Sequence, residues 1–571
     1  MSNFTTSPGV AISEIDNTYL TGQPVQAGAA IIGPTIKGPV EKPTLVTTYS
    51  DFVTMFGDTF ISGGNSYSYL TSIAAYNYFN YGGTSLLVAR VVTGSYSSAT
   101  STTIPNYLNT ASSSFSLETI SEGAIMNNSS SVAGASGSLI SGSVDNVRWE
   151  ITNSNTGSGT FNLLVRRGND TTANKIVLEA WNNLTLDPNS NRYIAKVIGD
   201  QKLQYNDSTE QMDISGSYPN NSKYIRVKTV TNPTPNYFDA TGVAVSAYTA
   251  SIPTNGSGSA GGSFSGAVGV ASSSIKLYDE IGANTQGLIG ASYNNMITLL
   301  GNPEAYQFNV LFTPGLLNDT HTAQVTNIIS NTIARGDSMY VMDLGVYGTS
   351  LPEAVTQAQT RDTSYAATYW PWVRIIDPAT GKHVWVPAST VIPGVYAFND
   401  KVSAPWFAPA GINRGGLSTV LQAELKLTQG NRDALYSNNI NPIATLPQQG
   451  VVVYGQKTLQ KAQSALDRVN VRRLMIELKS YIKQIADTIV FEQNTIQTRN
   501  SFLSRVNPYL ETIQQKQGLY AFRVVMDDSN NGPAVIDQNQ LVGQIYIQPT
   551  RTAEFISLDF ILQPTGAQFP V

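Results

Sequence analysis

Few side chains in this sequence are of the types that carry acid–base or metal chemistry near neutral pH. Histidine, the usual general base and metal ligand, occurs only at His321 and His383. His383 follows the turn residues Pro378 and Gly381, and His321 stands at a predicted helix start. The absence of cysteine excludes disulfides, thiolate nucleophiles and zinc–sulfur sites, and fits a reducing compartment. We therefore expect neither histidine to be catalytic and the chain not to be an enzyme.

Two glycine motifs have the spacing of phosphate-binding loops. Gly450–Thr458 (GVVVYGQKT) resembles a Walker loop, but Gln456 separates the second glycine from Lys457, and the residues between the glycines favour a strand. Gly256–Gly261 (GSGSAG) has dinucleotide-loop spacing, but it follows no apolar strand and precedes no predicted helix. We predict a strand at the first motif, a linker at the second, and no nucleotide or other cofactor.

Adjacent carboxylates at Asp527 and Asp528 invite a calcium interpretation. Ser529 at the third loop position and Gln538 at the twelfth lack the carboxylates that a calcium loop needs. A tight turn between strands is the prediction here, with no metal. Other acids could form a glycosidase pair within a β-rich region, but no spacing selects two of them.

Chain length, net charge and hydropathy further restrict the classes of protein to which this sequence can belong. A chain of 571 residues is longer than a single hydrophobic core usually accommodates, so two to four domains are expected. A formal net charge of −5 argues against a nucleic-acid partner. The N-terminal residues show no signal-peptide pattern, and no apolar run is long enough for a membrane anchor. We expect a soluble protein of mixed α+β or α/β class.

Residues 95–281 differ in amino-acid composition from the segments that precede and follow them. Strands are predicted at 27–33 and 84–92, with a helix capped by Ser50 and another over 68–82 that ends at Gly82. Residues 95–281 are rich in Ser, Thr, Asn and Gly and contain strand-like pieces at 145–153, 159–168, 174–181 and 223–230. They are predicted to be a β-rich surface insertion of one or two domains.

Alternation of helix and strand resumes after Ile281. Strands are predicted at 306–315 and 338–346 around a helix over 322–336. Two helices follow, over 471–494 and 495–517, and then strands at 519–527, 540–549 and 553–564. The expected mixed α/β core is thus built from both sides of the insertion, as 28–94 and 282–552.

Paired cations at Arg472 and Arg473 occupy the first turn of the helix over 471–494, where the helix dipole favours an acid. Two interpretations are open. The arginines are solvated at a small cost, or acids of another element or a neighbouring subunit neutralise them. The second interpretation makes them possible inter-subunit charge contacts.

Several segments, taken together and in order, resemble the contractile tail sheath family of bacteriophages and related injection machines. They cover about two thirds of the chain on both sides of the insertion. These segments are SPGVAISEI, AAIIGPTIKGPV, LVTTYSDFVTMFG, YFNYGGTSLLVARVV, YWPWVRIIDPATGKHVWVPAS, APAGINRGGL, RDALYSNNINPIATLPQQGVVVYGQKTL, VNVRRLMIELKSYIKQIADTIVFEQN and PTRTAEFISLDFIL.

The resemblance implies a structural subunit that forms stacked hexameric rings around an inner tail tube and contracts to drive the tube through a bacterial envelope. Implied partners are further copies of the chain, the tube, the baseplate and the tail terminator, without nucleic acid or membrane anchoring. The implied location is the virion tail sheath, assembled in the host cytoplasm.

In that family, terminal arms reach neighbouring subunits and add strands to a shared sheet. The N-terminal arm would lie within 1–27 and the C-terminal arm within 553–571. The exchanged residues would be Val10, Ala11, Ile12, Ser13, Glu14 and Ile15, and Ala553, Glu554, Phe555, Ile556, Ser557, Leu558, Asp559, Phe560, Ile561 and Leu562. Alternatives are the sheath of a bacterial injection system and a tailspike-like or wall-degrading enzyme that binds saccharide.

Overall fold

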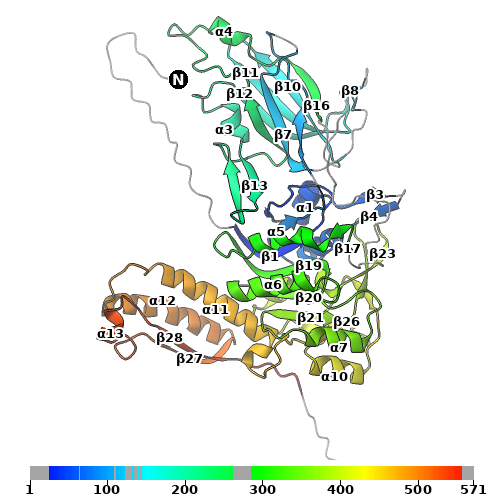
Figure 1. Cartoon of the computed structure of the whole chain (residues 1–571), viewed down its shortest axis with the longest axis vertical. Helices are drawn as coiled ribbons and strands as arrows, with labels where there is room; N and C mark the ends of the chain where they lie inside the picture. The colour runs from blue at the N-terminus through cyan, green and yellow to red at the C-terminus, as the bar shows by residue number, and fades with distance from the viewer. Residues whose placement is uncertain are drawn as a thin grey trace, which may run out of the picture.

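The computed structural model describes residues 25–62, 65–94, 96–108, 111–122, 132–133, 138–139, 144–261 and 284–555 (Figure 1). Helices and several sheets alternate along these residues, which confirms the predicted mixed α/β class. None of the helices in these ranges is long and apolar enough to cross a bilayer.

The largest sheet has eight strands in the order β2-β5-β1-β19-β20-β21-β25-β26. Its six inner strands run parallel, and β2 and β26 pair antiparallel at the two edges. We call it the central sheet. Its strands are β1 (Val25–Gly33), β2 (Thr44–Val46), β5 (Leu86–Arg90), β19 (Tyr306–Leu317), β20 (Met339–Asp343), β21 (Ala366–Trp370), β25 (Asn441–Leu446) and β26 (Gly450–Val453).

Alternate residues of β1 enter two different apolar cores, one on each face of the central sheet. Ala29 and Ile31 contact the core covered by α1 (Tyr49–Phe56), α2 (Leu70–Asn80) and α8 (Ile392–Val402). Ala30 and Ile32 contact the core covered by α5 (Asn294–Leu299), α6 (Thr322–Arg335), α7 (Leu351–Gln359) and α10 (Gln429–Ser437). The central sheet is therefore buried on both faces.

A separate antiparallel sheet of seven strands is formed by residues 98–261, in the order β12-β11-β10-β16-β6-β7-β15. It has its own apolar core, which includes Phe115, Trp149 and Phe161. Figure 1 shows it at one end of the molecule, beyond α1 and the central sheet. Its strands are β6 (Ser98–Ser101), β7 (Phe115–Glu122), β10 (Val147–Asn155), β11 (Thr160–Arg167), β12 (Val177–Thr185), β15 (Ile225–Val230) and β16 (Gly256–Gly261).

The predicted linker at Gly256–Gly261 is wrong, because this segment is β16, which pairs with β10 and β6. The indole of Trp149 explains one of the glycines: a Cβ on Gly258 would lie 2.5 Å from the ring atom Cζ2 of Trp149. Absence of a side chain therefore lets a strand pass under a large aromatic ring.

The two sheets meet at Arg90, the last residue of β5, whose side chain is fully buried. Its Nη1 donates to the carbonyls of Gly38, at 2.5 Å, and Glu122, at 2.8 Å. Burial lowers the pKa of Arg90 to about 10. The Glu122 carboxylate accepts from the Val40 amide at 2.9 Å and from Lys42 Nζ at 2.5 Å. This junction is therefore polar and directional.

A helical hairpin and a strand hairpin make a further unit with its own apolar core. The helices are α11 (Val469–Asp487) and α12 (Ile496–Gln515), and the strands are β27 (Leu519–Val525) and β28 (Gln544–Pro549). Figure 1 shows this unit on the flank of the central sheet. Both predicted helices are confirmed, although α11 ends at Asp487 rather than near Asn494.

Smaller elements complete the described chain. The predicted cap Ser50 is wrong: Thr48 is the N-cap of α1, and its hydroxyl accepts from the Asp51 amide. The remaining elements are β3 (Phe60–Ser62), β4 (Asn65–Tyr67), β8 (Val132–Ala133), β9 (Ser138–Leu139), α3 (Ile194–Ile198), β13 (Lys202–Asn206), β14 (Gln211–Ser215), α4 (Ser246–Thr249), β17 (Asn284–Thr285), β18 (Leu288–Ile289), η1 (Gly290–Tyr293), β22 (Val373–Ile376), β23 (His383–Val386), η2 (Ala388–Thr390), α9 (Gly411–Arg414), β24 (Val420–Ala423), η3 (Ala465–Asp467) and α13 (Pro533–Ile536).

One carboxyl group is enclosed where β20 ends. Burial raises the pKa of Asp343 to about 7, although the amide and hydroxyl of Ser389 both donate to its carboxylate and oppose the rise. Between the unfolded pKa of 3.8 and about 7, the folded state holds the proton more tightly. The contribution of Asp343 to the free energy of unfolding therefore falls as pH rises through this window, by about 1.4 kcal/mol per pH unit.

Asp343→Asn should raise the melting temperature at pH 8 and leave it nearly unchanged at pH 4. The amide is neutral at both pH values and can accept from the Ser389 amide and donate to its hydroxyl. Thermal melts across pH 4 to 8 measure the difference, with the exposed Asp537→Asn as control. A difference between variant and wild type that does not change with pH would contradict the assignment.

Candidate functional site

Arg472 and Arg473 are buried in the first turn of α11, at 4% and 5% exposure. The solvated interpretation of this pair is therefore wrong. Asp400 of α8 lies beside Arg473, with Asp400 Oδ2 at 2.5 Å from Nη2. The guanidinium also lies 4.8 Å from the centre of the Tyr396 ring. An acid of another element thus neutralises Arg473 within the same subunit.

Electrostatics at Arg473 favour its charged form. Burial opposes the charge, but Asp400 and the hydroxyls of Tyr396 and Tyr369 outweigh it and raise the pKa of Arg473. The same environment raises the pKa of Glu477, first through burial and then through Asp400. The ion pair therefore joins the start of α11 to α8.

Arg472 is held without a carboxylate among the described residues. Its guanidinium lies 4.0 Å from the centre of the Tyr365 ring and donates to the hydroxyl of Ser364. Burial lowers its pKa, and Tyr365 opposes the shift. A ring face replaces the acid that was expected. A contact of either arginine with a neighbouring subunit stays a prediction.

The strand hairpin β27–β28 presents one covered face and one exposed face. Val525 lies opposite Gln544 in its antiparallel register. Phe522 and Ile547 pack on the core of α11 and α12, whereas Tyr520 and Tyr546 are 61% and 57% exposed. Among the described residues, neither strand has a second partner, so the hairpin is a two-stranded sheet with two open edges.

Of the residues predicted to be exchanged, only 553–555 fall within the described chain, and residues 25–27 of the predicted N-terminal arm belong to β1. Val10–Ile15 and 556–562 lie outside the described residues. Residues 553–555 have no regular secondary structure, so the predicted strand does not begin within the described chain. Glu554 is the residue that holds them, because its carboxylate accepts from Arg468 Nε at 2.7 Å and Arg468 Nη2 at 2.9 Å.

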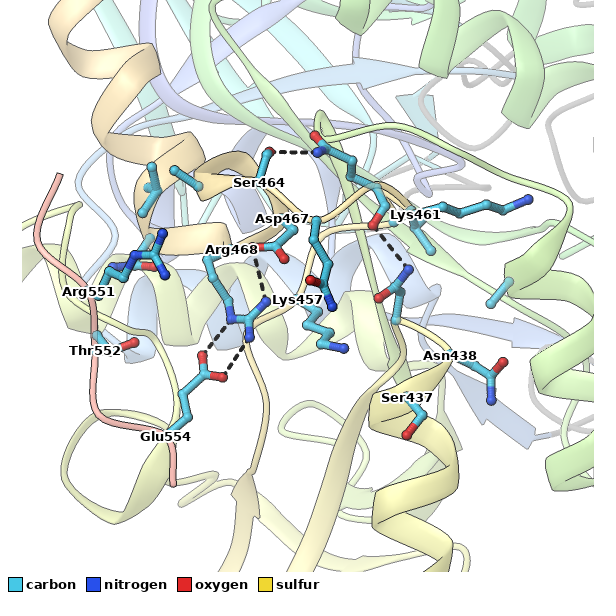
Figure 2. Close-up of a pocket in the computed structure, with 18 of the residues that line it drawn as sticks. Ser437, Asn438, Lys457, Lys461, Ser464, Asp467, Arg468, Arg551, Thr552 and Glu554 are labelled. Carbon is cyan, nitrogen blue, oxygen red and sulfur yellow. Dashed lines mark hydrogen bonds and ion pairs between the residues drawn. The ribbon is translucent and has the colours of Figure 1, made fainter. Parts of the chain in front are cut away.

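A cavity of about 1110 Å³ lies beside Glu554, between the 457–471 segment, the end of α10 and residues 551–555 (Figure 2). Cations outnumber acids on its walls. The basic lining residues are Arg361, Lys457, Lys461, Arg468 and Arg551, and the acidic ones are Asp467 and Glu554. No sequence pattern distinguished this group, because its members are dispersed over nearly 200 positions.

The segments whose spacing suggested a phosphate loop or a calcium loop form a strand and a turn in the structure. Gly450–Val453 is strand β26, as predicted, and Lys457 Nζ donates to the Tyr436 carbonyl at 2.8 Å. Asp527 accepts from the Ser529 amide in the predicted turn, and Asp528 pairs with Arg499 at 2.7 Å. Across the described ranges, no cluster of three or more His, Asp or Glu side chains is arranged to hold a metal ion.

The Arg473–Asp400 pair generates a stability prediction. Arg473→Glu should lower the free energy of unfolding of the subunit, because it places a new carboxylate beside Asp400 and Glu477. The loss should lie near the lower end of roughly 3–5 kcal/mol, since the Asp400 side chain stays 34% exposed. Chemical denaturation of the unassembled subunit measures it.

A matched control is Arg505→Glu on the exposed face of α12, which should change stability little. Wild-type stability of Arg473→Glu together with a failure to assemble would contradict the intrachain assignment and favour a partner in a neighbouring subunit.

Two family models match the second half of the chain. The phage tail sheath protein central domain matches residues 286–459, and the phage tail sheath C-terminal domain matches residues 461–563. The first covers the central sheet from β19 to β26, and the second covers the α11–α12 unit and beyond.

Two curated relatives are tail sheath proteins of phages. The chain is 41% identical over 217 residues to that of Vibrio phage KVP40, covering 38% of this chain and 32% of the relative. It is 42% identical over 185 residues to that of Enterobacteria phage T4, covering 32% of this chain and 28% of the relative. The matched region thus spans about a third of the length of these relatives.

A solved structure shares the fold over most of the chain. The crystal structure of a sheath tail protein from Listeria innocua superposes with a TM-score of 0.51 and 10% identity, over 92% of this chain and 96% of that one. The relatives are structural tail proteins, which agrees with the expectation that the chain is not an enzyme. From these matches, residues 286–459 and 461–563 belong to the central and C-terminal domains of the phage tail sheath protein family.

Proposed function

We propose that the chain is the structural subunit of a contractile tail sheath in the virion. Copies stack as hexameric rings around an inner tube, and contraction drives the tube through a bacterial envelope. The observation that supports this most directly is the β27–β28 hairpin with its two open edges, because an unpaired edge is a template for a strand of another chain.

The terminal arms supply the added strands in this proposal. Residues Val10–Ile15 of one neighbour, and the part of the Ala553–Leu562 arm beyond Phe555 of another, pair with the open edges of β27 and β28. An added strand of about six residues forms roughly four to six backbone hydrogen bonds at about 1 kcal/mol net each, less the entropy of ordering the arm. Each link is weak alone, but repetition around a ring makes the linkage multivalent.

The remaining partners follow from the same role. The tube lies inside the stack, and the baseplate and the tail terminator lie at its two ends. A sheath of a bacterial injection system would use the same links, and differs only in deployment. Work stored in the packing of subunits requires no nucleotide hydrolysis.

Electron microscopy of the purified full-length chain tests the function. Tubes or short striated sheaths are expected, whereas deletion of residues 1–20 should leave a folded monomer with an unchanged thermal melt. The segment precedes β1, so its removal leaves the strands of the central sheet in place. A truncated chain that still forms contractile tubes would exclude arm exchange.

A sharper pair of variants keeps the chain length constant. Prolines at Ile12 and Glu14 remove two strand amides, whereas prolines at Thr5 and Thr6 remove two amides outside the predicted strand. Assembly should fail in the first variant and persist in the second. Equal assembly of both would show that strand pairing by the arm is not needed.

Residues 95–281 form, in this proposal, an outward-facing surface domain that polymerisation does not require. The central sheet draws its strands from both sides of this block, and insertions that a fold tolerates leave its pairing intact. The contacts to be lost include those of Glu122, which accepts from Val40 and Lys42 and whose carbonyl accepts from Arg90.

Replacing residues 95–281 by a short linker should therefore give narrower particles from a less stable subunit. Adding Arg90→Met should restore part of the lost stability, because the buried guanidinium would otherwise lose the Glu122 carbonyl and keep only those of Gly38 and Ile36. Melting temperatures and particle diameters measure both effects. A folded deletion variant that forms no polymer would show that the block takes part in assembly.

A further inference from the structure

The segment that follows β28 is attached to the rest of the subunit through side chains. Among the described residues, the last backbone–backbone hydrogen bond of this region joins the Thr550 amide to the Gly518 carbonyl at 3.1 Å. Arg551 and Ala553 are exposed, and Phe555 is 83% exposed. Apolar burial therefore contributes little to holding residues 551–555.

One carboxylate receives four hydrogen bonds instead. Arg468 donates to Glu554 through Nε and Nη2, the Tyr436 hydroxyl donates at 2.7 Å, and Gln456 Nε2 donates at 3.0 Å. Figure 2 shows the two dashed contacts between Arg468 and Glu554 at the edge of the cavity. The Glu554 side chain is only 17% exposed, so water replaces few of these donors.

The donors are held in place by contacts that do not involve Glu554. Arg468 Nη1 also pairs with Asp467 at 3.0 Å. The ammonium group of Lys457 lies over the ring of Tyr436, with Nζ 4.6 Å from the ring centre, and this contact helps to fix the ring whose hydroxyl donates to Glu554. Gln456 is 2% exposed. The three donors therefore form a site organised for a carboxylate.

We propose that Arg468, Tyr436 and Gln456 form a carboxylate clamp that fastens the C-terminal segment to the subunit through Glu554. A further hydrogen bond runs from Gln456 Nε2 to Thr552 Oγ1 at 2.5 Å. Because the other four hydrogen bonds end on one carboxylate, neutralising Glu554 loosens the segment from residue 551 onward. The central sheet and the β27–β28 hairpin keep their own cores and stay folded. The clamp sets the point from which the residues beyond Phe555 leave the subunit, whether or not the chain assembles.

The charges around Glu554 indicate how the clamp depends on pH. Burial raises the pKa of Glu554, but hydrogen bonds from Arg468, Tyr436 and Gln456 outweigh it and lower the pKa below 4.5. The other groups near the carboxylate are Asp467, Lys457 and the exposed Arg551. A lowered pKa means that the clamp is complete above pH 4.5 and is lost as pH falls through the folded value.

Limited trypsin digestion of the full-length, unassembled subunit at pH 8 tests the clamp. Cleavage after Arg551 requires local release of the bonded segment, and mass spectrometry identifies the product that lacks residues 552–571. Glu554→Gln should increase the rate of this cleavage about tenfold with an unchanged melting temperature. Tyr436→Phe, which removes one donor, should give a smaller increase.

Glu511→Gln is the matched control, because it neutralises an exposed carboxylate on α12 and leaves Glu554 and its donors untouched. Its cleavage rate after Arg551 should equal that of the wild type. The proposal would be overturned if the Glu554→Gln variant were cleaved after Arg551 at the wild-type rate. It would also be overturned if that variant had a lowered melting temperature, because Glu554 would then stabilise the core and not only the segment. The assay uses the single subunit, so a failure to form sheath would leave its result unaffected.

Discussion

The parallel pairing of β1 with β19 is the constraint on which the other features depend. It places Val25 opposite Tyr306 and Ile31 opposite Phe312, across the whole middle of the chain. A parallel strand pair needs a crossover between its strands. Here β5 pairs with the other edge of β1 and ends before residue 95. Residues 95–281 therefore connect β5 to the rest of the central sheet without contributing a strand to it. The seven-stranded sheet can therefore have a separate core.

Arginine occupies the joints between the units that this arrangement creates. Arg90 joins the central sheet to the seven-stranded sheet, Arg473 joins α11 to α8, and Arg468 joins the core to the C-terminal segment. A guanidinium fixes direction through several donors, whereas apolar contacts allow sliding. These polar, directional connections supplement apolar ones, since Val469 and Ile476 of α11 belong to the core of the central sheet and Met212 of β14 packs on the core of its other face.

Helices and strands were predictable from the sequence where a local pattern of apolar residues or a local capping residue determines them. The apolar run of β1, the period of α6 with its left-handed Gly336, and the Thr495 cap of α12 each depend on neighbouring residues only. The prediction for Gly256–Gly261 was wrong because the partners of this strand, β10 and β6, and the Trp149 ring that leaves no room for a side chain at Gly258 lie about 100 or more residues away.

Charge partners were predictable in kind but not in identity. The dipole argument left open whether Arg473 is solvated or neutralised by an acid of another element, and Asp400 lies on another helix with no fixed spacing from it. Arg472 did not require an acid at all, because the Tyr365 ring takes that place. Glu554 was singled out only as part of an arm, and its role at the clamp depends on Tyr436, Gln456 and Arg468 meeting in space.

On the proposed function, the uneven distribution of apolar and polar contacts has a mechanical consequence. A subunit that must change its relation to its neighbours needs rigid bodies and connections that can be displaced at small cost. Close-packed cores resist gradual deformation. The joint at Glu554 and an exchanged strand instead involve a few hydrogen bonds each, which can break and re-form singly. Contraction would then be absorbed at the arms and their roots, while the central sheet moves as one piece.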